Sequence, residues 1–244
     1  MGKIKIFDTD ALVFKAAADL ILQLCERSIA TKGTFTIALS GGNTPKKLYG
    51  LLAQAPYVKK INWKNIFVFW GDERCVPVYD EENNSHMASV ALLSNVPIPK
   101  ENIFPVPVNF EPSKAAARYE QMIKTFFKEK EPHFDLILLG LGEDGHTASL
   151  FPGTDILDEK KALVKQVYSK EKNMYRISFT IPLINDARHI LFLVTGKEKS
   201  SIIGKLFAKP AKKNVLPAQL IKPIKGDLHW FLDKPAASSL KIKN

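Results

Sequence analysis

The fold follows from residues 35–45, which read Phe35-Thr-Ile-Ala-Leu39-Ser40-Gly-Gly-Asn-Thr-Pro45. The first five residues are apolar and β-prone, whereas the Ser-Gly-Gly-Asn-Thr-Pro run is typical of a tight turn. A helical segment from Lys46 to about Gln54 follows this turn. The stretch therefore predicts a unit of strand, turn and helix.

The same unit recurs along the chain. Apolar strands end in polar, glycine-containing loops: Ile66–Trp70 before Gly71-Asp-Glu-Arg74, Phe134–Leu139 before loop 140–146, and His189–Val194 before Thr195-Gly196. Further strands are expected at 163–167 and 176–179, and helices at 113–129 and from Asp10, as cap, to near Gly33. This alternation predicts an α/β fold with a mostly parallel, modified Rossmann-like sheet flanked by helices on both faces. Ligands of such sheets bind beyond the carboxyl ends of the strands, where the polar loops lie.

Length and composition narrow the class of protein. The chain has 244 residues, with 35 Lys plus Arg against 25 Asp plus Glu, a formal net charge of +10. This length suits one α/β domain over residues 1–244, and 45% hydrophobic residues argue against disorder. The sequence shows neither a membrane-spanning run nor a signal-peptide block, so we expect a cytoplasmic protein. We also expect a monomer or a weak dimer. Two cysteines, Cys25 and Cys75, are too few for a disulfide framework or a four-cysteine zinc site.

The loop Gly140-Leu-Gly-Glu-Asp-Gly-His146 fits the spacing of a dinucleotide-binding turn. Glu143 and Asp144, however, would place two carboxylates where a pyrophosphate should bind, so we expect no nucleotide cofactor. The loop suits acid/base chemistry better, because Asp144 can fix the tautomer of His146 and stabilise its charged form. The alternative is that His146 only caps the following turn.

Two further loops carry polar groups suited to an anionic substrate. Ser40, Gly41, Gly42 and Thr44 offer backbone N–H groups, hydroxyls and a helix N-terminus, a cradle suited to phosphate, although a simple turn is the alternative. Asp72, Glu73 and Arg74 form either part of the same site or a surface cluster of ion pairs. The sequence shows no spacing typical of a metal site, and we expect the other histidines, His86, His133, His189 and His229, to be surface or packing residues.

Three segments together resemble the 6-phosphogluconolactonase family, within the glucosamine/galactosamine-6-phosphate isomerase superfamily. They are Ala38-Leu-Ser-Gly-Gly-Asn-Thr-Pro45, Phe69-Trp-Gly-Asp-Glu-Arg-Cys-Val-Pro77 and Gly140-Leu-Gly-Glu-Asp-Gly-His-Thr-Ala-Ser-Leu-Phe-Pro152. The resemblance continues through 176–185, 195–199, 216–218 and 228–233, and so covers essentially the whole chain. It is more specific than any one of these motifs taken alone.

The resemblance implies an esterase without cofactor that hydrolyses 6-phospho-D-glucono-1,5-lactone in the oxidative pentose phosphate pathway. It adds Arg176 and Lys199 to the phosphate cradle and assigns His146, Asp144 and Arg74 to catalysis. Asp72 and Glu73 would bind sugar hydroxyls or support the residues that do. Two positions, Asn83 and Tyr79, depart from the family pattern.

Two alternative functions stay open on the sequence. Glucosamine-6-phosphate deaminases share the glycine turn and the Gly-x-Asp-Gly-His loop, but generally carry Glu five residues after the histidine, where this chain has Phe151. A nucleic-acid-binding module would explain the stretch Lys197 to Lys225, with eight Lys against one Glu. Phe207 is the only aromatic residue there, so we favour a solvated lysine face that attracts an anionic substrate, and expect neither nucleic acid nor membrane as a partner.

Overall fold

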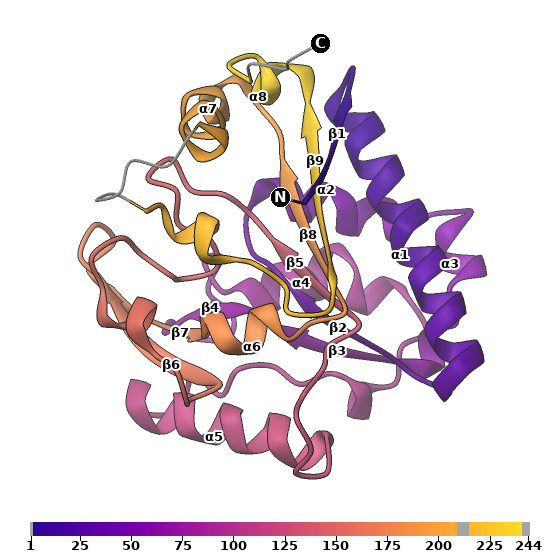
Figure 1. Ribbon diagram of the computed structural model, residues 1–244. Coiled ribbons are helices and arrows are strands. Elements are labelled where there is room, and N and C mark those ends of the chain that lie inside the picture. Colours follow the sequence, from indigo (N-terminus) through magenta and orange to yellow (C-terminus); the bar gives the residue numbers. More distant parts are fainter. Residues whose placement is uncertain (1, 209–214, 241–244) are drawn as a thin grey trace.

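The computed structural model describes residues 2–208 and 215–240 of the chain. Its main sheet has six parallel strands in the order β1-β9-β8-β5-β2-β3 (Figure 1). These strands are β1 (Lys3–Phe7), β2 (Phe35–Leu39), β3 (Ile66–Trp70), β5 (Leu136–Leu139), β8 (His189–Val194) and β9 (Asp227–Asp233). Strands β2 and β5 are wholly buried, as expected for a sheet that is covered on both faces. The predicted α/β fold is therefore confirmed.

A second sheet joins the first at its carboxyl edge. It is antiparallel, in the order β4-β7-β6, and consists of β4 (Asp72–Arg74), β6 (Val164–Ser169) and β7 (Met174–Phe179). Only Gly71 separates β3 from β4, so the chain passes directly from the main sheet into the second one. The strands expected at 163–167 and 176–179 thus belong to this small sheet and form a hairpin with each other.

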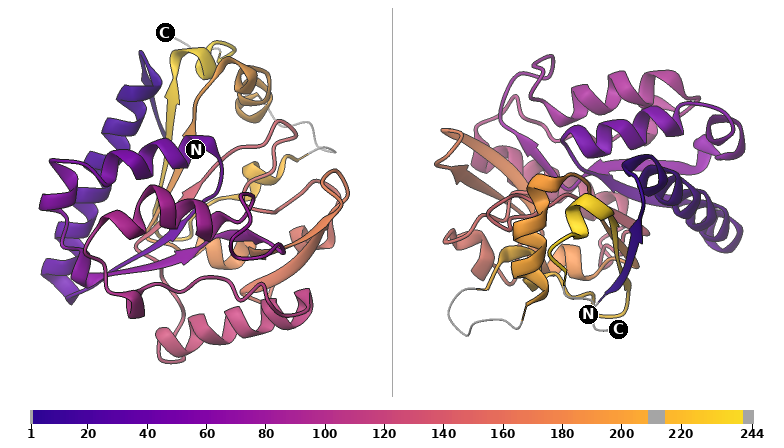
Figure 2. Two further views of the ribbon diagram at one scale, coloured as in Figure 1. Left: turned by 180° about the vertical axis from the view of Figure 1, so that it is seen from behind. Right: turned by 90° about the horizontal axis from the view of Figure 1, so that it is seen from above.

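Helices cover both faces of the main sheet (Figures 1 and 2). One side carries α1 (Asp10–Lys32), α2 (Asn43–Leu52), α3 (Tyr57–Lys60) and α4 (Asn84–Ala91). The other carries α6 (Ile181–Asn185), α7 (Ser200–Phe207) and the small sheet, against which α5 (Pro112–Phe126) packs, and α8 (Lys234–Ala237) follows β9. No helix in the described part of the chain has the length and apolar character needed to cross a membrane.

The ends of α1 show how local chemistry sets a boundary. Gly33, with φ of 81°, ends the helix as predicted, since this left-handed conformation favours glycine. The cap at the other end is Thr9 rather than Asp10: Thr9 has an extended backbone, and its Oγ1 accepts a hydrogen bond from Leu12 N at 3.3 Å. Asp10 is the first helical residue and pairs with Lys47 instead.

Most of the stretch Lys197 to Lys225 can be described. Lys197 donates to Ser238 Oγ at 2.8 Å, Lys205 is exposed on α7, and Lys222 is exposed beyond it. Lys209, Lys212 and Lys213 lie outside the described residues. The solvated lysine face therefore stays a prediction for that part of the stretch.

Tyr119 of α5 satisfies the backbone at the end of β3, an edge strand of the main sheet. Its hydroxyl accepts from Trp70 N at 2.8 Å and donates to Trp70 O at 3.1 Å, and the side chain is almost fully buried. The tyrosine therefore takes the place of a neighbouring strand just before the chain enters the small sheet.

Replacing Tyr119 with Phe should destabilise the protein by about 1–3 kcal/mol, because a buried N–H and C=O would lose their shared partner. The free energy of unfolding, measured by urea titration, tests this expectation. Tyr79→Phe is the matched control, since Tyr79 is exposed. Equal stability of the two variants would contradict the role given to Tyr119.

Candidate active site

A cavity of about 350 Å³ lies at the carboxyl edge of the main sheet, where the two sheets meet. Its walls come from the loops after β2, β5 and β8, from β4 and β7, and from the start of α4. Four larger hollows, of about 640, 590, 580 and 470 Å³, lie elsewhere. The first of these is mainly apolar, and none of the four contains a predicted site residue. The smaller cavity is therefore the candidate site.

His146 and Asp144 form a hydrogen-bonded pair in the loop after β5. Asp144 Oδ1 lies 2.5 Å from His146 Nδ1 and also accepts from His146 N at 3.0 Å. Gly142 makes this loop possible, because a Cβ at that position would lie 2.1 Å from the imidazole. With Nδ1 held by Asp144, Nε2 is the ring nitrogen left to exchange a proton with a ligand.

The ionisation of Asp144 agrees with this pairing. Partial burial favours the neutral acid, but hydrogen bonds from the side chain and backbone of His146 outweigh it and hold the pKa of Asp144 below its usual value. Asp144 is thus a carboxylate, and its hydrogen bonds with the side chain and backbone of His146 orient the imidazole.

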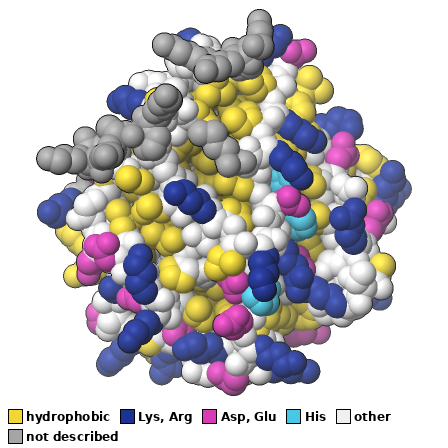
Figure 3. Space-filling model, in the orientation of Figure 1, with side chains coloured by type: hydrophobic (Ala, Val, Ile, Leu, Met, Phe, Trp, Pro, Cys, Tyr) yellow, Lys and Arg dark blue, Asp and Glu magenta, His cyan; other side chains and the backbone are white. Residues whose placement is uncertain are grey.

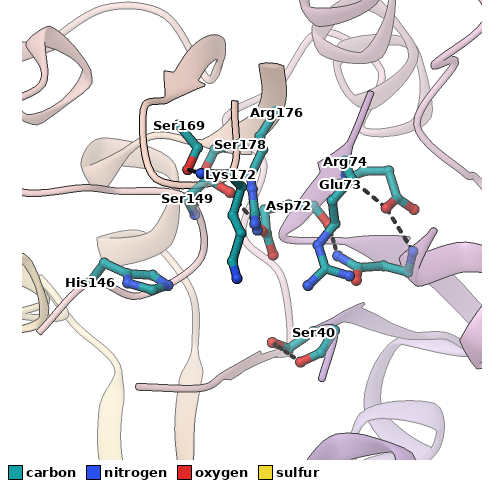
Figure 4. A network of polar contacts seen from close by, with 12 residues as sticks. Ser40, Asp72, Glu73, Arg74, His146, Ser149, Ser169, Lys172, Arg176 and Ser178 are labelled. Atoms are coloured by element: carbon teal, nitrogen blue, oxygen red, sulfur yellow. Dashed lines mark hydrogen bonds and ion pairs between the residues drawn. The ribbon is translucent and has the colours of Figure 1, made fainter. Parts of the chain in front are cut away.

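Two arginines lie beside each other on neighbouring strands of the small sheet. Arg74 on β4 is in register with Arg176 on β7, so their side chains share the face that borders the cavity (Figure 4). Like charges directly opposite each other in an antiparallel pair are destabilising. Asp72, two residues before Arg74, offsets this repulsion at Arg176, with its Oδ2 3.9 Å from Arg176 Nη1. The arrangement leaves a surplus of positive charge beside His146.

Burial of the two guanidinium groups strengthens their attraction for an anion. Burial, with Arg74 contributing, lowers the pKa of Arg176, and only about 10% of its side chain is exposed. The Nε atoms of Arg74 and Arg176 are buried and have no hydrogen-bond partner among the described residues. Both arginines therefore have unused donor capacity at a site in which an anion would be strongly favoured.

The glycine turn after β2 forms the opposite wall. Gly42, with φ of 103°, caps α2, and among the described residues no side chain bonds to the backbone N–H groups of the first turn of that helix. Tyr49 fixes the turn, since its hydroxyl accepts from Ser40 N at 3.0 Å and donates to Ser40 O at 2.8 Å. Thr44 Oγ1 lies 3.1 Å from Thr195 Oγ1. These N–H groups and hydroxyls lie together at the start of a helix, an arrangement suited to an anion.

The structure brings most of the predicted residues together. Those that line the cavity are Ser40, Gly41, Gly42, Thr44, Asp72, Arg74, His146, Arg176 and Lys199. Asp144 stands behind His146, and Lys199, which follows β8, has its Nζ 3.9 Å from Glu143 Oε1. Neither Asn83 nor Tyr79 lines the cavity: Asn83 is buried and caps α4, whereas Tyr79 is exposed.

Glu73 points away from the cavity and holds the neighbouring elements together. It is fully buried, and its carboxyl accepts from the backbone N–H groups of Arg74, Asn84 and Ser85 at 2.7–2.8 Å. It therefore ties β4 to the start of α4. Of the two roles that the sequence left open for Glu73, this position is compatible with supporting the residues that bind the sugar.

Three residues that line the cavity, or hold a residue that lines it, were not predicted from the sequence. Ser149 donates to Asp72 Oδ2 at 2.7 Å, Asn84 donates from Nδ2 to Asp72 O at 2.9 Å, and Thr195 pairs with Thr44. Ser149 and Thr195 fall within motifs that were noted, but their partners lie on other elements. Among the described residues, the side-chain clusters that could hold a metal ion lie outside this cavity.

Comparisons with known proteins agree with the resemblance seen in the sequence. A family model described as "Glucosamine-6-phosphate isomerases/6-phosphogluconolactonase" matches residues 8–230. A 6-phosphogluconolactonase of Synechocystis sp. is 46% identical over 219 residues, 88% of each chain, and one of Nostoc sp. is 42% identical over 239 residues, 96% of each. The structure of 6-phosphogluconolactonase from Trypanosoma cruzi superposes with a TM-score of 0.88 at 32% identity, covering 99% of this chain and 98% of that one.

The pKa of Glu73 gives a testable dependence of stability on pH. Burial raises this pKa from 4.5 to about 7, although the three N–H donors oppose the shift. The folded protein therefore keeps a proton that the unfolded chain loses near pH 4.5, so the contribution of Glu73 to stability falls as the pH rises from 4.5 to 7. Relative to Glu73→Gln, the wild type should lose roughly 3 kcal/mol over this range. Urea unfolding at several pH values measures the difference, and parallel profiles for the two proteins would contradict it.

Proposed function

Because the chain belongs to the family of glucosamine-6-phosphate isomerases and 6-phosphogluconolactonases, we propose that it hydrolyses 6-phospho-D-glucono-1,5-lactone to 6-phospho-D-gluconate. This is the lactone-hydrolysing step of the oxidative pentose phosphate pathway. The observation that carries the proposal is the single cavity in which the His146–Asp144 pair faces Arg74, Arg176 and Lys199. A base and a cluster of cations in one cavity suit a substrate with both an electrophilic carbonyl and a phosphate.

The surroundings of His146 favour lactone hydrolysis over deamination. Phe151 occupies the position at which deaminases generally carry Glu, and its ring centroid lies 4.7 Å from that of the imidazole. The same ring lies 5.5 Å from the guanidinium carbon of Arg176. An apolar ring cannot carry out the proton transfers that open an aminosugar ring, whereas hydrolysis of a lactone needs only one acid/base group.

The proposed reaction begins with His146 as general base. Nε2 takes a proton from a water molecule while the water oxygen forms a bond to the lactone carbonyl carbon. Asp144 stabilises the imidazolium that results. When the tetrahedral intermediate collapses, the bond between the carbonyl carbon and the ring oxygen breaks, and the ring oxygen takes the proton from Nε2. The products are a carboxylic acid, which then ionises, and a free hydroxyl, without a covalent intermediate.

The other site residues would bind the substrate and the developing charge. The glycine turn with Ser40, Gly41, Gly42 and Thr44, together with Arg176 and Lys199, would hold the 6-phosphate. The tetrahedral oxyanion would be stabilised by Arg74 or by backbone N–H groups of the glycine turns, and loss of one such donor costs roughly 3–4 kcal/mol in other enzymes. Asp72, held by Ser149, would orient Arg176 and accept from sugar hydroxyls.

Two assays run side by side test the proposed function. Freshly prepared 6-phosphogluconolactone is supplied, and its loss above the spontaneous rate is followed by a coupled reaction. Glucosamine 6-phosphate is supplied in parallel and ammonia is measured. We expect lactone hydrolysis without ammonia release, and ammonia without lactone hydrolysis would instead identify a deaminase.

Replacing His146 with Ala should lower kcat by about 10²–10⁴, the usual contribution of a general acid/base group, and should leave the fold intact. The matched control is His133→Ala, because His133 is also paired with an aspartate, Asp186, at 2.9 Å but does not line the cavity. Turnover close to that of the wild type in His146→Ala would exclude His146 as the base.

Replacing Lys199 with Ala should mainly raise KM, by about 10- to 100-fold, because a hydrogen bond to a charged group contributes about 1.5–3 kcal/mol. Arg176 variants should act in the same direction, but they also leave the buried Asp72 without its cation, so Lys199 is the cleaner test. Lys205→Ala, an exposed lysine of the same basic stretch, is the control. A fall in kcat with KM unchanged would contradict a role in phosphate binding.

A further inference from the structure

Two histidines and an aspartate meet at the sheet edge opposite the cavity. His189 and Asp227 are the first residues of β8 and β9 and are in register, and His229 lies two residues after Asp227. Partners on adjacent strands, and residues two apart in one strand, project to the same face. His189, Asp227 and His229 therefore share one face, and we refer to them as the edge cluster. Figure 3 shows histidine, acidic and basic side chains together on the face of the molecule that it draws.

The donor atoms of the edge cluster are close together. One donor atom from each residue can be chosen so that all three lie within 4.8 Å of one another. His189 Nδ1 is 3.7 Å from Asp227 Oδ2, and the two imidazole centroids are 5.9 Å apart. Two donors on a tetrahedral zinc ion are about 3.4 Å apart, given bonds of about 2.0–2.1 Å. Small side-chain rotations would therefore bring the three donors onto one ion.

Both imidazoles of the edge cluster have unused nitrogens. His189 Nδ1 and His229 Nε2 are buried from solvent and have no hydrogen-bond partner among the residues that the structure describes. Leaving a buried polar atom unpaired costs free energy. Asp227 accepts from Lys3 Nζ at Oδ1, at 3.2 Å, which leaves Oδ2 toward His189.

We propose that His189, Asp227 and His229 bind one divalent transition-metal ion, for which the set of two imidazoles and a carboxylate favours Zn²⁺. The ion would link the start of β8 to the start of β9. Strand β8 has six residues at about 3.3 Å each, so the ion would lie about 20 Å from the loop that follows β8 at the cavity. Its role is therefore to stabilise the fold and not to act on the substrate.

A neighbouring cluster, formed by Glu131, His133 and Asp186, provides the contrast. His133 Nδ1 lies 2.9 Å from Asp186 Oδ2 and 3.1 Å from Asp186 O, so this nitrogen already has partners. The edge cluster differs because its buried nitrogens have none in the described chain. His133→Gln is therefore the matched control for the binding experiment.

The experiment uses the full-length, tag-free protein after treatment with a chelator. Zn²⁺ is titrated by calorimetry, and Co²⁺ is used as a spectroscopic probe of tetrahedral coordination. We expect one ion per chain and a higher Tm with Zn²⁺. His189→Gln, His229→Gln and Asp227→Asn should each weaken binding at least tenfold, whereas His133→Gln should bind like the wild type.

A second measurement uses only the wild-type protein and so does not require that any variant folds: it follows the protection of histidines from chemical modification by bound Zn²⁺. Zn²⁺ should slow the modification of His189 and His229 by diethyl pyrocarbonate, read by mass spectrometry, and should leave that of His133 unchanged. The proposal is overturned by wild-type protein that takes up no Zn²⁺, by binding that survives in the folded His189→Gln/His229→Gln variant, or by equal modification with and without Zn²⁺. None of these outcomes bears on lactone hydrolysis, so the two proposals are tested separately.

Discussion

The repulsion between Arg74 and Arg176 is the constraint around which the site is built. The antiparallel pairing of β4 with β7 places these guanidinium groups opposite each other, partly shielded from water. Asp72, held by Ser149 at 2.7 Å, lies 3.9 Å from Arg176 Nη1 and offsets this repulsion, but it is one carboxylate beside two guanidinium groups. If the cavity binds a phosphosugar as we propose, its negative charge would interact favourably with both guanidinium groups.

The elements around this pair are held by buried hydrogen bonds to the backbone. Glu73 ties β4 to α4, Tyr49 ties the glycine turn to α2, and Tyr119 closes the end of β3. The two tyrosines satisfy backbone groups at the ends of β3 and β2, and Glu73 satisfies N–H groups in the first turn of α4, where partners within the strand or helix are not available. The cavity walls are therefore fixed by groups that do not themselves line it, which keeps the His146–Asp144 pair and the cations at defined positions.

The chemistry of the loops and the positions of the buried strands could be predicted from local sequence. The strands 35–39, 66–70 and 189–194 have the predicted bounds, because apolar β-prone runs next to glycine are strong local signals. Strands β1, β4 and β9 were not predicted. Strand β1 is an edge strand with alternating Lys residues, and β4 consists of three charged residues that acquire strand geometry only by pairing with β7. The cap of α1 was also misplaced by one residue, since Thr9 and Asp10 are both good capping residues.

By itself, the sequence determined the class of fold, and it predicted the acid/base pair and the phosphate cradle that we propose, because each is encoded within a few consecutive residues and was strengthened by the family resemblance. The tertiary structure decided which of these loops meet. It placed Arg176 opposite Arg74, turned Glu73 away from the cavity, and recruited Ser149, Asn84 and Thr195. It also brought His189 beside Asp227 and His229. Such contacts join residues distant along the chain through strand pairing and register, and register depends on how the whole sheet buries its apolar faces.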